Sequence, residues 1–142
     1  MSDIIHTDTA PAPVGAYPHA RRVGQLLFLS GIGPRQPGNN AIPGNVNNAA
    51  GQLLGYDFEA QCRQVFANVR AVLEASGAAW TDLVDVTVFL TDMQRDFPLY
   101  NRLYAEYFHG VDACRTTLGV SALPTPIAIE LKCIAAVPMP SR

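Results

Sequence analysis

The first candidates for chemistry are two charged residues near the end of the chain, in a stretch that otherwise looks buried. Residues 127–134 alternate as a β-strand does, with an apolar face opposite a face that contains Glu130 and Lys132. An ionised group is costly to remove from water, so a charge in such a strand needs a partner or a function. A carboxylate in this position is suited to transferring protons.

Arg115 lies in the preceding stretch, where it alternates with Thr117 and Gly119. Residues 114–122 and 127–137 read as two strands joined across residues 123–126, and a β-hairpin of this kind places Arg115 on the same face as Glu130, within a few rungs. A guanidinium binds a planar carboxylate by two parallel hydrogen bonds, so this pair could hold and process a small anion. A purely structural salt bridge is the alternative that the spacing leaves open.

The elements that must position these residues indicate an α+β fold. Residues 17–30 predict a β-hairpin, residues 57–76 a helix capped by Asp57, and residues 83–91 a half-buried strand. Asp96 is the expected cap of a second helix that continues to about residue 109. One mixed sheet should carry both helices on one face, and the uncovered face should drive self-association, most simply as a closed ring of identical subunits.

The remaining segments are less regular. Residues 1–15 are expected to form an extended arm or an edge strand, because the prolines in APAPVG disfavour a helix. Residues 33–55 are rich in Gly, Pro and Asn and predict a long excursion that returns as a short strand near residues 52–54. The whole chain, residues 1–142, is expected to form a single domain.

Composition argues against several classes of function. Hydrophobic residues make up 49% of the chain and charged residues 15%, which fits a protein with a subunit interface. The net charge is −2 and there is no basic stripe, so we expect no nucleic-acid partner. With no leader and no apolar run of membrane-spanning length, we expect a cytoplasmic protein. Three cysteines and three histidines without ligand spacing predict free thiols and no metal.

The segment CRTTLGVSALPTPIAIELKCIAAV resembles the C-terminal signature of the Rid (YjgF-like) family of enamine and imine deaminases. The resemblance extends along the chain, through Leu29-Ser30-Gly31 and the segment DLVDVTVFLTDM to Tyr100-Asn101. It implies a chorismate-mutase-like fold, a homotrimer with active sites between subunits, and no cofactor.

The resemblance also implies roles for individual residues. The carboxylate-binding arginine falls on Arg115, the assisting backbone amide on Thr117, and the catalytic glutamate on Glu130. Other pocket positions match Tyr17, Ser30 and Asn101. A packing role is as plausible for Tyr17, a hydrogen-bonding role suits Ser30 better than a nucleophilic one, and Asn101 could serve only to cap a loop or satisfy buried backbone groups.

The long 33–55 segment and the basic residues Arg35 and Lys132 depart from the family pattern and hint at an unusual substrate. Together with whole-segment similarity, they favour the 2-aminomuconate deaminase branch of bacterial aromatic degradation, whose product is 4-oxalocrotonate. Arg35 or Lys132 would then bind the distal carboxylate, with ordinary surface charge as the alternative. The rival interpretations are a generalist deaminase of small 2-imino acids such as 2-iminopropanoate and 2-iminobutanoate, and a non-catalytic, carboxylate-binding regulatory module.

Overall fold

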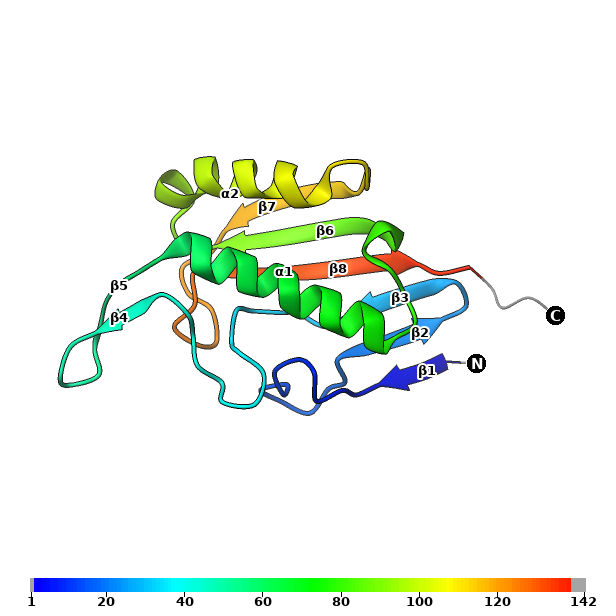
Figure 1. The fold of residues 1–142 in the computed structure, drawn as a ribbon, viewed down its shortest axis with the longest axis horizontal. Coiled ribbons are helices and arrows are strands. Elements are labelled where there is room, and N and C mark those ends of the chain that lie inside the picture. Colours follow the sequence, from blue (N-terminus) through cyan, green and yellow to red (C-terminus); the bar gives the residue numbers. More distant parts are fainter. Residues whose placement is uncertain (1, 139–142) are drawn as a thin grey trace.

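The computed structural model describes residues 2–138, which form a six-stranded sheet, a small two-stranded sheet and two α-helices (Figure 1). In chain order the elements are β1 Ser2–Ile5, β2 Ala20–Val23, β3 Leu26–Leu29, β4 Asn45–Asn47, β5 Leu53–Tyr56, α1 Phe58–Ala75, a short 3-10 helix Trp80–Asp82, β6 Leu83–Leu90, α2 Met93–Phe108, β7 Cys114–Gly119 and β8 Ile129–Ala136. The strand order across the large sheet is β1-β2-β3-β8-β6-β7. No helix in the described part of the chain is long and apolar enough to cross a lipid bilayer.

The sheet is mixed, because β6 and β7 run parallel while all other neighbours are antiparallel. Parallel strands need a crossover connection, and α2 supplies it. Both helices lie on the same side of the sheet (Figure 1). This arrangement confirms the predicted α+β class, with two helices on one face of a mixed sheet.

The predicted closing β-hairpin is wrong. β6 lies between β7 and β8, so β8 pairs with β6 on one side and with β3 on the other. Turn residues at 123–126 are compatible with either connection. In the central position both edges of β8 are paired, with β3 and with β6, whereas an outer position beyond β7 would leave one edge unpaired.

The sheet register decides which residues share a face, because residues paired directly across strands point to the same side. Val86 pairs with Cys133 of β8 and with Arg115 of β7. Val86 and Cys133 are buried, so this row faces the helices. Glu130 pairs with Phe89 in a row that faces the opposite, uncovered side.

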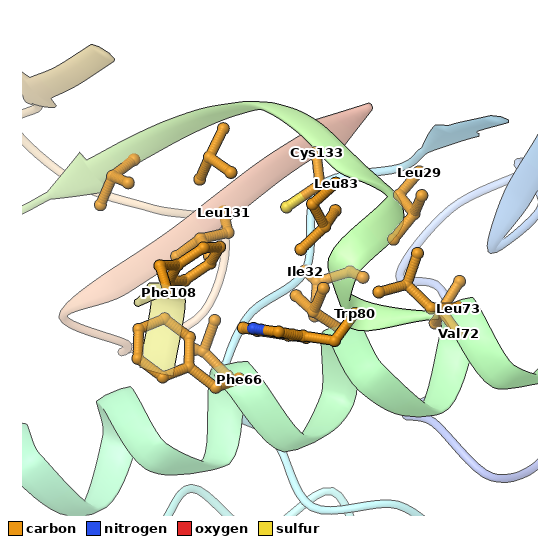
Figure 2. Close-up of a cluster of buried hydrophobic side chains, with 14 of the residues drawn as sticks. Leu29, Ile32, Phe66, Val72, Leu73, Trp80, Leu83, Phe108, Leu131 and Cys133 are labelled. Carbon is orange, nitrogen blue, oxygen red and sulfur yellow. The ribbon is translucent and has the colours of Figure 1, made fainter. Parts of the chain in front are cut away.

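The core lies between the helices and the sheet, where an aromatic cluster links α1 to α2 (Figure 2). The ring centroids of Phe66 and Phe108 lie 5.5 Å apart, and those of Trp80 and Phe108 lie 4.8 Å apart. The indole nitrogen of Trp80 donates to the carbonyl of Tyr107 at 2.9 Å. Aromatic burial of this kind fixes the position of α2 over β6 and β7.

The first helix begins and ends as predicted. The side chain of Asp57 accepts a hydrogen bond from the backbone N–H of Ala60, and Gly77 follows the helix with a φ of +75°. In β6, Val84 is exposed while Val86 is buried, because a register shift after Leu83 turns Val84 outward.

The predicted cap of the second helix is wrong. Asp92 caps α2 by accepting from the N–H of Arg95, and Asp96 lies buried within the helix. Asp96 accepts a hydrogen bond of 2.5 Å from the hydroxyl of Tyr56, which joins α2 to the end of β5. Pro98 lies in the second turn of the helix.

The segment 33–55 contains a strand, β4, that its composition did not reveal, and returns as β5 near the predicted position. The β4–β5 hairpin extends away from the large sheet (Figure 1). Its base is anchored by Gln61, which donates to the side chain of Asn45 at 2.7 Å and accepts from the N–H of Ala128 at 2.8 Å. Buried polar contacts therefore hold this excursion against the start of β8.

Candidate active site

Glu130 lines a cavity of about 170 Å³ near the point where β3 ends beside β8. Tyr17, Gly31 and Arg35 line the same cavity, together with the segment around Thr125. The N-terminal arm, the end of β3, the beginning of the 33–55 segment and β8 thus converge on one carboxyl group. The structure brings together three of the predicted site residues here, namely Tyr17, Arg35 and Glu130.

The environment of Glu130 disfavours the ionised form of its carboxyl group. Its side chain is half-buried, and removal from water raises the pKa of the carboxyl above its ordinary value. No cation within the described residues forms an ion pair with it. A desolvated carboxyl without a partner is a frequent mark of a functional site.

Hydrogen bonds hold both Tyr17, which lies in the wall of this cavity, and Ser30. The Tyr17 hydroxyl accepts a hydrogen bond from the N–H of Val14 at 3.2 Å, which leaves its own proton available to a ligand. Ser30 donates its hydroxyl proton to the carbonyl of Pro18 at 2.7 Å and lines an adjoining cavity with Tyr17 and Arg35. This hydrogen bond ties the segment after β3 to the N-terminal arm.

Arg115 belongs to a second cluster, between β7 and α2. Its guanidinium carbon lies 4.7, 5.4 and 5.8 Å from the ring centroids of Tyr104, Tyr100 and Phe97. One of its nitrogens donates to the side-chain oxygen of Asn101 at 3.0 Å. Burial raises the pKa of Tyr104, so its ring stays neutral beside the cation.

The contacts of Arg115 leave its charge without an anionic partner among the described residues. Arg115 is half-buried, contacts only neutral groups, and forms no ion pair with any described carboxylate. Thr117 follows on the same face of β7, and its buried hydroxyl oxygen has no hydrogen-bond partner in the described chain. The guanidinium fork is therefore held by an aromatic cage while hydrogen-bond donors remain unused.

The two clusters do not meet within one chain, which contradicts the expectation that Arg115 and Glu130 lie side by side. Arg115 faces the helices and Glu130 faces the uncovered side of the sheet. Two strand spacings and three residue rises separate them, which corresponds to roughly 14 Å between Cα atoms. The alternative of a structural salt bridge between them is excluded as well.

Lys132 shares a face with Glu130 but does not line its cavity. Its ammonium group donates to the backbone carbonyl of Leu29 at 2.5 Å, so it ties β8 to β3. Of the two predicted cations, only Arg35 lies in the cavity wall.

Sequence reasoning missed Gly31 and the aromatic cage. A Cβ atom placed on Gly31 would lie 2.9 Å from an oxygen of Glu130, so only glycine leaves the carboxyl in place. The spacing Gly31-Ile32-Gly33 was a signal of close backbone approach. No cluster of three or more His, Cys, Asp or Glu side chains suited to a metal ion occurs between residues 2 and 138. The cysteines at 62, 114 and 133 are free thiols, as predicted.

Residues 7–137 match the family described as Endoribonuclease L-PSP. A RutC family protein of Pyrococcus horikoshii is 38% identical over 95% of this chain and 98% of its own length. A 2-iminobutanoate/2-iminopropanoate deaminase of Dermatophagoides farinae is 35% identical over 94% of this chain and 95% of its own.

Solved structures agree with these sequence matches. The crystal structure of RidA from the Antarctic bacterium Psychrobacter matches with a TM-score of 0.81 and 32% identity, and covers 95% of this chain and 99% of that one. The chain therefore belongs to the Rid (L-PSP) family, which its residues resemble. Two of the relatives carry the word deaminase in their names, the one from Dermatophagoides farinae and a Reactive Intermediate Deaminase A of Arabidopsis thaliana, which is 35% identical over 94% of this chain and 65% of its own length.

Proposed function

We propose that this protein is a hydrolytic deaminase of 2-imino acids and of the enamines that tautomerise to them. The observation that carries the proposal is the pair of complementary clusters: a desolvated carboxyl, Glu130, in an open cavity, and a caged guanidinium, Arg115, without a carboxylate partner. One suits proton transfer and the other suits an α-carboxylate. Membership of the Rid family supports this class of reaction.

The complete site is proposed to form between two copies of the chain. In one chain the two clusters face opposite sides of the sheet, so no small substrate reaches both. Arg115 lies on β7, the edge strand of the sheet, next to a row of unpaired backbone groups. Glu130 lies on the sheet face that no helix covers. A closed homotrimer that docks the β7–α2 edge of one subunit onto the uncovered face of the next brings the clusters together.

In this arrangement Arg115 and the backbone N–H of Thr117 hold the C1 carboxylate of the substrate. An enamine first tautomerises to the imine, which makes C2 electrophilic. Glu130 then takes a proton from a water molecule as the water oxygen bonds to C2, and it passes this proton to the imine nitrogen, which gives a carbinolamine. In the collapse of this intermediate Glu130 takes the hydroxyl proton as the C=O bond forms and delivers it to the nitrogen, which leaves as ammonia when the C2–N bond breaks. The products are a 2-oxo acid and ammonia, and no cofactor enters the balance.

Two substrate ranges fit this mechanism. Small 2-imino acids, such as 2-iminopropanoate, need only the carboxylate clamp of Arg115, and the deaminase relative supports this range. The enamine 2-aminomuconate, which would give 4-oxalocrotonate, carries a second carboxylate, and the observation that favours it is the presence of Arg35 in the wall of the Glu130 cavity.

The proposal is tested by adding the purified protein to imines generated in situ and to 2-aminomuconate, and following ammonia release. A Glu130→Ala variant should lose turnover by about 10²- to 10⁴-fold and still bind 2-oxo acids. Turnover that survives in a folded Glu130→Ala variant contradicts the mechanism. Ligand binding without turnover in the natural protein indicates a carboxylate-binding module, and cleavage of RNA in a parallel control indicates nuclease chemistry.

A further inference from the structure

We infer that Arg35 is a second carboxylate receptor, which makes dicarboxylic imino acids the preferred substrates of this site. The inference rests on the proposed function and names its substrate class. Arg35 and Glu130 line one cavity, with Tyr17 and Gly31 also in its wall. A substrate whose C2 lies at Glu130 therefore extends its far end toward a guanidinium.

The guanidinium of Arg35 is held from two sides by neutral groups. One terminal nitrogen donates to the carbonyl of Ala12 in the N-terminal arm at 2.7 Å, and the other donates to the side chain of Asn40 at 2.9 Å. Its ion-pairing capacity is unused, because no described carboxylate lies within ion-pair distance of it. A cation fixed by carbonyl oxygens keeps its full charge for a ligand.

The backbone of Arg35 is equally well fixed. The side-chain amide of Asn68, which is 1% exposed, donates to the carbonyls of Gly33 and Arg35 at 2.9 and 2.8 Å. A buried side chain of α1 thus sets the position at which this segment leaves the sheet. Fixing both ends of a long side chain lowers the entropy lost when it binds a ligand.

Arg35 and Glu130 share a cavity without forming an ion pair, and burial alone accounts for the raised pKa of Glu130. The two charged groups therefore lie in the wall of one cavity but beyond ion-pair distance of each other. Lys132 does not compete for the far carboxylate, because its ammonium group is bound to Leu29. Arg35 is the remaining predicted cation that faces a substrate.

The test compares two imines of equal chain length, generated in situ from glutamate and from norvaline by amino-acid oxidases. They differ at the far end, which is a carboxylate in one and a methyl group in the other. Arg35→Gln keeps a donor for the carbonyl of Ala12 and removes the charge. Its ratio of kcat/KM for the glutamate imine over the norvaline imine should fall about 10- to 100-fold, the loss of one charge-assisted contact.

Arg22→Gln is the matched control, because the guanidinium of Arg22 also donates to backbone carbonyls, those of Gly24 and Pro138, away from the cavity. In Arg22→Gln the ratio of kcat/KM for the glutamate imine over the norvaline imine should equal that of the natural protein. An unchanged ratio in Arg35→Gln, or equal losses on both imines, overturns the inference. An Arg35→Lys variant should recover part of the ratio, since it restores charge without the fork.

Binding separates this inference from the proposed function. Calorimetric titration of the assembled protein with 2-oxoglutarate and 2-oxopentanoate needs no turnover. If the protein hydrolyses neither imine but binds 2-oxoglutarate more tightly through Arg35, the deaminase proposal fails and the dicarboxylate site stands. If it hydrolyses the norvaline imine and binds both 2-oxo acids equally, the deaminase proposal stands and the Arg35 inference fails.

Discussion

Gly31→Ala changes one atom next to the carboxyl on which the mechanism depends. Between the pairs Phe28–Ile134 and Ile32–Leu131, the segment that contains Gly31, just after β3, has one residue more than β8. This β-bulge brings the backbone of Gly31 against Glu130. The φ of Gly31 does not lie in the positive region, so alanine adopts the local backbone without strain.

The size of the effect follows from the contacts of the added methyl carbon. It would lie 2.9 Å from a carboxylate oxygen of Glu130 and 3.2 Å from the carboxyl carbon, where 3.4 to 4 Å is ordinary contact. The carboxyl group must therefore move by about half an ångström or more. A displacement of 1 Å in a catalytic group can cost about 100-fold, so we expect kcat to fall about 10- to 100-fold. The end of a glutamate side chain moves easily, so the loss of stability should stay below about 1 kcal/mol.

The assay measures kcat and KM for one imine, and thermal unfolding for stability. Gly55→Ala is the control, because a Cβ at Gly55 meets no atom within 4 Å and its φ is not positive. The control should keep the natural kcat. If Gly31→Ala also keeps the natural kcat, or changes only KM, the carboxyl of Glu130 does not act where the structure places it.

Two further predictions concern protonation and the loop that supports the cavity. Because burial raises the pKa of Glu130 and its basic form is the ionised one, kcat/KM should fall as pH decreases through a value above the ordinary glutamate pKa of about 4.3. A pH–rate profile measures this midpoint, and a midpoint at or below about 4.3 contradicts the assignment. Asn68→Ala leaves the carbonyls of Gly33 and Arg35 without donors, so the free energy of unfolding should fall by about 1–3 kcal/mol in urea titrations. An unchanged midpoint of unfolding would show that the amide does not hold this segment.

Elements defined by local periodicity were predictable from the sequence. The helix capped by Asp57 and closed at Gly77 follows from residues that contact one another within a few positions. The second helix was also predictable, but its cap was not, since Asp92 and Asp96 are equivalent at the level of local sequence. The hydroxyl of Tyr56 distinguishes them, and it comes from 40 residues earlier in the chain.

Strand pairing was beyond the reach of local patterns. β8 has two edges, and the sequence around residues 123–126 does not reveal that β6 occupies the edge expected for β7. The same non-local choice decides the geometry of the site. Residue types and the family resemblance identify Glu130 and Arg115. Only the position of β6 between β7 and β8 shows that the two side chains face opposite sides of the sheet. β4 was missed for a related reason, because Asn45–Asn47 is a strand only through its pairing with β5.

The central claim is that a working site takes Glu130 from one copy of the chain and Arg115 from another. Arg115→Ala and Glu130→Ala proteins are prepared separately, unfolded, mixed in equal amounts and refolded together, with mass spectrometry to confirm mixed assemblies. Each variant alone should be inactive. In a random mixture, the copy that supplies Glu130 to a site has this residue intact with a probability of one half, and the copy that supplies Arg115 likewise. About one site in four is therefore complete, so activity should recover to about a quarter of the natural level. Mixed assemblies that remain inactive would contradict the account.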